Sequence, residues 1–205
     1  MNTSRTSTLI DTLMPEYDFN EVHSIEINAS AESVLIAIKE LKANELSWIF
    51  HLLIAMRELP EKLFGNDFIN KSFFDGQQSM LEKMNAGGFI KLGEITNREI
   101  VLGLLIPETI GKFWKRAPKV NLGSKKYQDF ISFNSPDFAK VTLNFLIDRK
   151  EKTILRTETR ILPLSPKMYN SFKIYWSIIH IGSAWIRRIW LKAIKRHAER
   201  IEPTS

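Results

Sequence analysis

The C-terminal stretch of this 205-residue chain, from Ser165 to about Arg200, constrains the fold more than any other segment. It opens with a serine that can act as a helix N-cap and with Pro166 at the first helical position, where a missing N–H costs nothing. On a helical wheel, one apolar line contains Trp176 and Trp190, and a second line contains Trp185. A helix that is apolar over more than half of its circumference must be covered on two sides. The sequence therefore predicts one long central helix.

The same helix is too short in apolar length to cross a bilayer. Its uncharged run from Ile174 to Ile186 is closed by Lys173 and Arg187, whereas a membrane span needs about 20 apolar residues. We expect no transmembrane segment, although contact with a membrane surface stays open. A straight helix of this length would measure roughly 50 Å, against about 27 Å for an eight-residue strand. We therefore expect it to overhang the sheet or to bend near Gly182-Ser183.

Composition bounds the protein class. With 44% hydrophobic residues the chain can build one core, which predicts an N-terminal arm over 1–18 and a single domain over 19–205. There is no cysteine, which excludes disulfides and thiolate chemistry, and the polar start resembles no secretory signal. A cytoplasmic protein is the default expectation. We expect the arm to dock through four apolar side chains, namely Leu9, Ile10, Leu13 and Met14.

The net charge of +6 is confined to the C-terminal helix. Eight of the Lys and Arg residues and two of the Glu residues follow Pro166, and the rest of the chain is balanced. A solvated helix end that matches the helix dipole is the favoured interpretation, but the same charges could meet anionic lipid or phosphate. We expect no nucleic-acid partner, and either a monomer or a homodimer.

The remaining pattern predicts an α+β order. Residues 22–28 alternate as a half-buried strand that points His23 inward, and two helices follow, over 31–41 and 45–59. Two strands around Thr96-Asn97 form a hairpin, with a bend expected at Gly103. Further strands are predicted at 128–134, 139–148 and 153–164, with one side of 139–148 facing the core and the other facing water. The expected fold is a curved antiparallel sheet wrapped around the closing helix.

Several stretches together carry a family resemblance. They are LPEKLFG, REIVLGLLI followed by GKFW, LRTETRI, the spacing Phe172-x-x-Tyr175-Trp176, and IRRIWLKAIKRHAE. In this pattern the chain resembles an uncharacterised bacterial family of the START-like, helix-grip superfamily (SRPBCC), which includes the birch pollen allergen, polyketide cyclases and lipid-transfer START domains. The resemblance implies a helix-grip fold with a cavity between sheet and helix. It implies no particular reaction, because that superfamily hosts both carriers and enzymes.

The strand over 155–161 separates two kinds of side chain. Period two places Thr157 and Thr159 on one side, which is the natural inward face, and Arg156, Glu158 and Arg160 on the other. We expect those three to form an exposed ladder of charges. The alternative is a bulge that turns Glu158 or Arg160 inward and leaves a buried charge in need of a partner.

These observations predict a cavity and leave three functions open. The leading hypothesis is a soluble binding module for a lipid-like or polycyclic molecule. The second is a cyclase- or dehydratase-like enzyme in which His23 or Glu158 moves a proton, and the third is a structural protein with a filled core. Neither a metal nor a cofactor is expected, because the four histidines have no zinc spacing. The predicted cavity residues are Trp48, Trp114, Phe145, Thr157, Thr159, Tyr175 and Trp176.

The second apolar line of the long helix needs a cover. Exposure of Ile174, Ile178, Ile181 and Trp185 would create a patch that soluble monomers seldom tolerate. The candidates are the N-terminal arm, the segment 60–86, a second copy of the chain and a bilayer surface. We favour the segment 60–86, because its aromatic residues otherwise have no destination.

Overall fold

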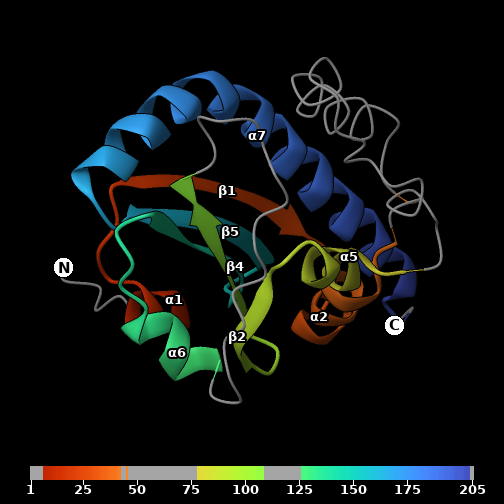
Figure 1. Ribbon diagram of the computed structural model, residues 1–205. Helices are drawn as coiled ribbons and strands as arrows, with labels where there is room; N and C mark the ends of the chain where they lie inside the picture. Colours follow the sequence, from red (N-terminus) through yellow and green to blue (C-terminus); the bar gives the residue numbers. More distant parts are fainter. Residues whose placement is uncertain (1–6, 43–44, 46–77, 109–125, 204–205) are drawn as a thin grey trace, which may run out of the picture.

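The computed structural model describes residues 7–42, 45, 78–108 and 126–203, without the side chains of Lys126, Tyr175, Ile178, Ile179 and Ile181. In these ranges the chain is α+β, with a five-stranded antiparallel sheet and a long C-terminal helix (Figure 1). The sheet order is β1-β5-β4-β3-β2, for β1 (Phe19–Ile27), β2 (Ile90–Ile95), β3 (Glu99–Pro107), β4 (Phe138–Arg149) and β5 (Thr153–Pro163). The described helices are α1 (Leu9–Leu13), α2 (Ala31–Glu40), α5 (Met80–Ala86), α6 (Lys126–Ser132) and α7 (Pro166–Ile201).

Helix α7 confirms the predicted C-terminal helix and its start. The Ser165 hydroxyl accepts a hydrogen bond from the Met168 N–H at 3.1 Å, as an N-cap does. The helix is continuous to Ile201, and Figure 1 shows it as an arch over the sheet rather than a straight rod. The bend expected near Gly182 is therefore a gradual curvature without a break in the helix. Within the described residues, no helix is long and apolar enough to cross a membrane.

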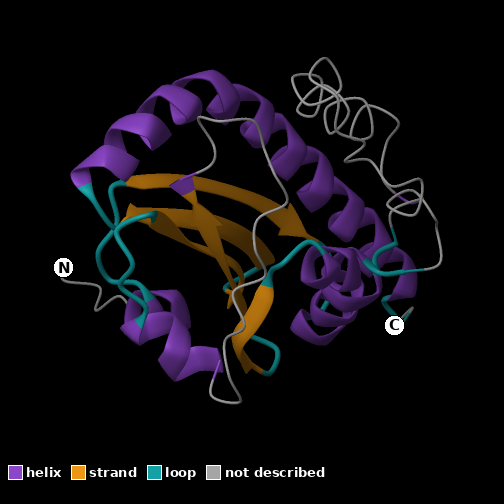
Figure 2. Cartoon of the chain, viewed as in Figure 1, coloured by secondary structure: helices purple, strands orange, loops and turns teal. Residues whose placement is uncertain are grey.

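Helices cover both faces of the sheet (Figure 2). The inner face, which we define as the one toward α7, packs against α7, α2 and α5 around fully buried residues such as Ile38, Leu143 and Ile194. The strands predicted at 22–28, in the hairpin, at 139–148 and at 153–164 are confirmed, as is the first of the two predicted helices, whose N-cap is Ser30. The second predicted helix, 45–59, lies outside the described residues except for Glu45.

The outer face of the sheet is covered as well, which the sequence did not predict. Ile10 and Leu13 of α1 and Phe130 of α6 bury Val101 and Leu105 of β3. The expected docking of the N-terminal arm is confirmed, but the expected wet side of β4 is wrong. Its outward residues, Lys140, Thr142 and Asn144, are all buried, because the arm and α6 exclude water there.

Helix α6 replaces the strand predicted at 128–134. A short apolar run is compatible with the period of a strand and with that of a helix. Here the segment is helical, and Phe130 packs against β3, distant in the sequence. The same contact explains the glycine within β3, where we expected a bend. A Cβ at Gly103 would lie 2.7 Å from Leu92 Cδ1 and 3.0 Å from Phe130 Cε2, so this glycine makes room for two packed side chains.

The expected cover over the second apolar line of α7 is wrong for the side chains that are described. Ile174 is 69% exposed and Trp185 is 55% exposed. The described end of the favoured segment, α5, instead packs into the core beside α2 through Met80. Residues 60–77 lie outside the described ranges.

Candidate functional site

Four polar side chains form a patch on the inner face of β1 and β5. In the antiparallel register Glu21 lies opposite Thr159, and His23 lies opposite Thr157. Alternation along β1 sends Glu21 and His23 to the same face as Phe19 and Ile25, both of which pack against the core on the α7 side. We call these four residues, Glu21, His23, Thr157 and Thr159, the inner polar patch.

Hydrogen bonds fix the side chains of this patch. His23 Nε2 lies 2.6 Å from Glu21 Oε1, and the two side chains are 14% and 12% exposed. The Thr157 hydroxyl donates to the Asn144 carbonyl at 2.8 Å, which removes it as a free donor. The Thr159 hydroxyl accepts from Arg187 Nη2 at 3.0 Å, so one cation of α7 reaches the sheet at this point.

Aromatic clusters flank the inner polar patch along the axis of α7. On one side Phe172 lies 5.3 Å from Phe19 and 6.0 Å from Trp176, measured between ring centroids. On the other side Phe145 meets Trp190 edge to face at 4.9 Å. These contacts hold α7 onto the sheet at two places, and the patch lies between them.

Three consecutive residues of α7 between the two aromatic clusters have small side chains. Gly182, Ser183 and Ala184 are each only half-buried, and no described atom lies within 4 Å of a Cβ built at Gly182. At helical spacing Ser183 falls on the same line as Trp176 and Trp190, which both pack toward the sheet. The helix therefore packs on the sheet through Trp176 and Trp190, and the half-buried Ser183 lies on the same line between them.

Two buried polar atoms at this level have no hydrogen-bond partner within the described part of the chain. They are Glu21 Oε2, an acceptor, and the indole Nε1 of Trp190, a donor. Buried polar groups in proteins are almost always paired with protein or water, so each such atom indicates a missing partner. Arg187 lies close to both Glu21 and Trp190. Its guanidinium donates to Thr159, which lies opposite Glu21 in the sheet, and it is 5.7 Å from the Trp190 ring centroid.

Glu158 and Arg160 are not an exposed ladder. Their side chains are 5% and 8% exposed on the outer face, and Arg160 Nε donates to Glu158 Oε1 at 2.7 Å. Arg156, half-buried, donates to the other Glu158 oxygen at 2.7 Å. No bulge interrupts the pairing of β5 with β1 or β4, so the expectation fails because α1 covers the strand.

Helix α1 and the residue that follows it supply partners for two buried charged side chains of the outer face, Arg160 and Glu99. Arg160 donates to the Met14 carbonyl at 2.9 Å and to Asp11 Oδ1 at 2.6 Å, at the C-terminal side of the helix. Glu99, fully buried, accepts from the Leu9 N–H at 2.6 Å at the other end. Burial opposes ionisation of Asp11, but hydrogen bonds from Thr8 and Arg160 outweigh it and lower the pKa of Asp11 to about 2.

The predicted site residues separate into three groups. His23, Thr157 and Thr159 lie together in the inner polar patch, and Phe145 and Trp176 belong to the flanking aromatic clusters. Glu158 lies on the opposite face of the sheet and cannot share a cavity with His23. Trp48, Trp114 and the side chain of Tyr175 lie outside the described residues.

Sequence reasoning missed Glu21, Arg187 and Trp190 as members of this site. Glu21 was recoverable, because the alternation that turns His23 inward extends two residues further toward the N-terminus. Trp190 was recoverable as well, because it lies on the same helical line as Trp176. Arg187 carried no such signal, and only the tertiary structure brings it to Thr159.

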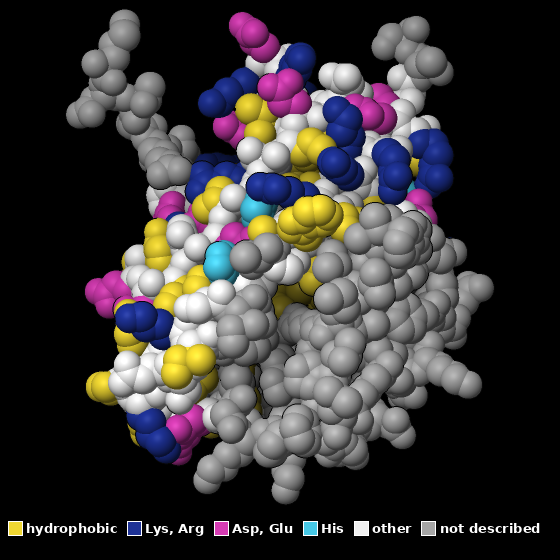
Figure 3. All heavy atoms as spheres, turned by 90° about the horizontal axis from the view of Figure 1, so that it is seen from above, with side chains coloured by type: hydrophobic (Ala, Val, Ile, Leu, Met, Phe, Trp, Pro, Cys, Tyr) yellow, Lys and Arg dark blue, Asp and Glu magenta, His cyan; other side chains and the backbone are white. Residues whose placement is uncertain are grey.

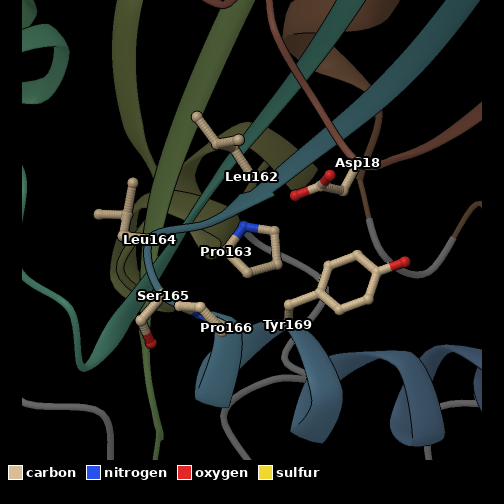
Figure 4. Close-up of a pocket in the computed structure, with 7 residues that line it drawn as sticks. All are labelled: Asp18, Leu162, Pro163, Leu164, Ser165, Pro166 and Tyr169. Atoms are coloured by element: carbon tan, nitrogen blue, oxygen red, sulfur yellow. The ribbon is translucent and has the colours of Figure 1, made fainter.

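Two surface hollows lie elsewhere. One, of about 410 Å³, opens where β5 passes into α7, with Leu162, Pro163 and Pro166 around it and Asp18 and Tyr169 to one side (Figure 4). The other, of about 690 Å³, is polar and is lined by residues of α2, α5 and the end of α7, including His197. Neither is lined by a residue predicted for the cavity.

Within the described part of the chain, no group of three or more His, Asp or Glu side chains is placed to hold a metal ion. Comparisons of the chain with family models, with curated proteins and with solved structures gave no match. The function must therefore be argued from the site itself.

Proposed function

We propose that this chain is a binding module of the helix-grip type, which holds a largely apolar small molecule between the sheet and α7. The carrying observation is the fixed inner polar patch on the α7 side of the sheet, with an aromatic cluster on either side of it. Small-molecule sites typically combine apolar walls with a few polar groups that fix orientation.

The unpaired atoms define the ligand more closely. Glu21 Oε2 is an acceptor, so the ligand should bring a donor such as a hydroxyl, and the Trp190 indole N–H can donate to an oxygen of the ligand. The flat rings of Phe19, Trp176 and Trp190 favour a polycyclic or lipid-like body. A hydroxylated apolar compound is therefore the proposed class of ligand.

A matched pair of probes tests this proposal. 1-Naphthol carries one hydroxyl and naphthalene none, and binding of each is measured by calorimetry on the full chain. A hydrogen bond to a charged group is worth about 1.5–3 kcal/mol, so 1-naphthol should bind roughly 10- to 150-fold more tightly. Glu21→Leu should abolish that preference. Glu26→Leu, which changes an outward-facing residue of the same strand, should keep it.

Mass spectrometry after denaturing extraction of the purified protein gives an independent check. An apolar compound bearing a hydroxyl or amine is the expected finding. Repeated absence of any small molecule, together with no binding of either probe, would contradict the proposal. That result would favour a structural protein with a filled core.

One observation favours an enzyme as the second candidate. The contact of 2.6 Å between His23 Nε2 and Glu21 Oε1 is the arrangement in which a carboxylate orients an imidazole for proton transfer. Glu158 has no part in this candidate, because it is paired with Arg156 and Arg160 on the outer face. In an enzyme, His23→Gln should keep the affinity for the extracted compound and remove its conversion. In a simple carrier no conversion occurs with either protein.

A further inference from the structure

The side of α7 that faces away from the sheet carries apolar and basic residues on one line. At about 100° per residue, Ile174, Trp185, Arg188, Lys192 and Arg196 lie within about 40° of a common direction. The three basic side chains are exposed, as are Ile174 and Trp185. We call these five residues the outer ridge.

The outer ridge follows the convex side of the arch. Figure 1 shows α7 as an arch whose convex side faces away from the sheet, and Trp185 lies near the middle of the helix that spans Pro166–Ile201. A flat surface that approaches this side would meet the middle of the helix first. Figure 3, which looks down on the molecule from above, shows hydrophobic side chains with Lys and Arg side chains around them.

The charges of the outer ridge are available to a partner. Among the described residues Arg188 and Lys192 form no ion pair, Arg196 donates to the Glu45 carbonyl at 3.4 Å, and Glu199 is the one carboxylate of α7 on the same side. Nearby acidic groups are committed elsewhere, since Glu199 binds Lys195 and Glu45 binds His197 and Arg200. The ridge therefore presents positive charge beside an exposed indole.

We propose that the outer ridge docks the protein on an anionic lipid surface, with Trp185 at the level of the headgroups. Basic residues next to an aromatic on one helix face are the pattern of interfacial helices, and indole rings favour the boundary between water and hydrocarbon. This inference does not rest on the proposed ligand, because the two use opposite sides of α7.

Charge decides against the two competing occupants. In a symmetric dimer centred on Trp185, Arg188 and Lys192 would lie against the Ile174 half of the second helix, which has no carboxylate between Pro166 and Trp185 to pair with them. A nucleic acid would satisfy the cations but would gain little from Ile174, because phosphate contacts dominate such binding. An anionic bilayer satisfies both the charges and the apolar side chains.

Cosedimentation of the full chain with vesicles tests the proposal. Vesicles that contain phosphatidylserine in phosphatidylcholine should bind the wild-type protein, vesicles of phosphatidylcholine alone should not, and added salt should weaken binding. Each cation near an anionic surface contributes about a factor of five, so Arg188→Gln with Lys192→Gln should weaken partitioning roughly 30-fold. Trp185→Ser should weaken it as well.

The matched control removes the same charge elsewhere. Lys150→Gln with Lys152→Gln alters two exposed lysines of the turn between β4 and β5, and it should leave partitioning within about twofold of wild type. Thermal unfolding verifies that each variant folds. If Trp185→Ser does not fold, Trp185→Phe is used in its place.

Four outcomes would overturn the proposal. The first is failure of wild type to bind the phosphatidylserine vesicles, and the second is an equal loss in the ridge and control variants. The third is a wild-type dimer that Trp185→Ser converts to a monomer, which would assign the ridge to a second copy. Binding of a mixed-sequence RNA that depends on Arg188 and Lys192 but not on Trp185, without vesicle binding, would assign it to a polyanion.

Discussion

Replacement of Arg160 by methionine should be the most destabilising single change at the outer face. Arg160 is 8% exposed and donates to Glu158, to Asp11 and to the Met14 carbonyl, so its loss leaves a buried carboxylate short of a partner and uncaps α1. Breaking a buried pair from one side costs about 3–5 kcal/mol. That is a large share of the roughly 5–15 kcal/mol by which a domain is stable.

A surface ion pair serves as the matched comparison. Lys152 binds Glu26 at 3.1 Å, but both side chains are more than 60% exposed, so Lys152→Met should cost at most about 1 kcal/mol. The double variant Arg160→Met with Glu158→Met should lose less than Arg160→Met alone, because the buried Glu158 carboxylate is then absent. Recovery should be incomplete, since the Met14 carbonyl still lacks its donor.

Urea denaturation followed by circular dichroism measures these differences. The free energies of unfolding are compared at neutral pH, with the slope against urea as a check that each variant unfolds in one step. If Arg160→Met costs no more than Lys152→Met, the buried network does not stabilise the fold and the argument is wrong.

Three further predictions concern acid stability and two glycines. Because the pKa of Asp11 falls from 3.8 to about 2 on folding, its contribution is present above about pH 4 and is lost as the pH falls toward 2. Urea unfolding across that range should show a shallower loss in Asp11→Asn, and an unchanged profile would contradict the assignment. Gly103→Ala should lower the unfolding free energy by about 1–3 kcal/mol, since its Cβ meets Leu92 and Phe130. Gly182→Ala should raise it by about 0.8–1 kcal/mol through helix propensity alone, and a loss there would indicate that the span needs its glycine.

The sequence by itself determined the elements whose signals are local. Ser165 and Pro166 marked the start of α7, strict alternation marked β1, and Thr96-Asn97 marked the turn of the hairpin. Alternation also placed Thr157 and Thr159 on the face of β5 that meets the helix. These signals could be recognised because each one depends on neighbours along the chain, where the backbone period fixes direction.

Only the tertiary structure decided what covers each surface. The alternation that places Glu158 and Arg160 on the outer face would be the same whether that face met water or α1. The two side chains form a buried network because the N-terminal arm covers them. The segment around Phe130 is a helix, and its Phe130 ring packs in the space that Gly103, distant in the sequence, leaves free. The exposure of Trp185 and the approach of Arg187 to Thr159 likewise follow from where α7 arches over the sheet. Such contacts join residues distant in sequence, and no periodicity within one segment encodes its partner.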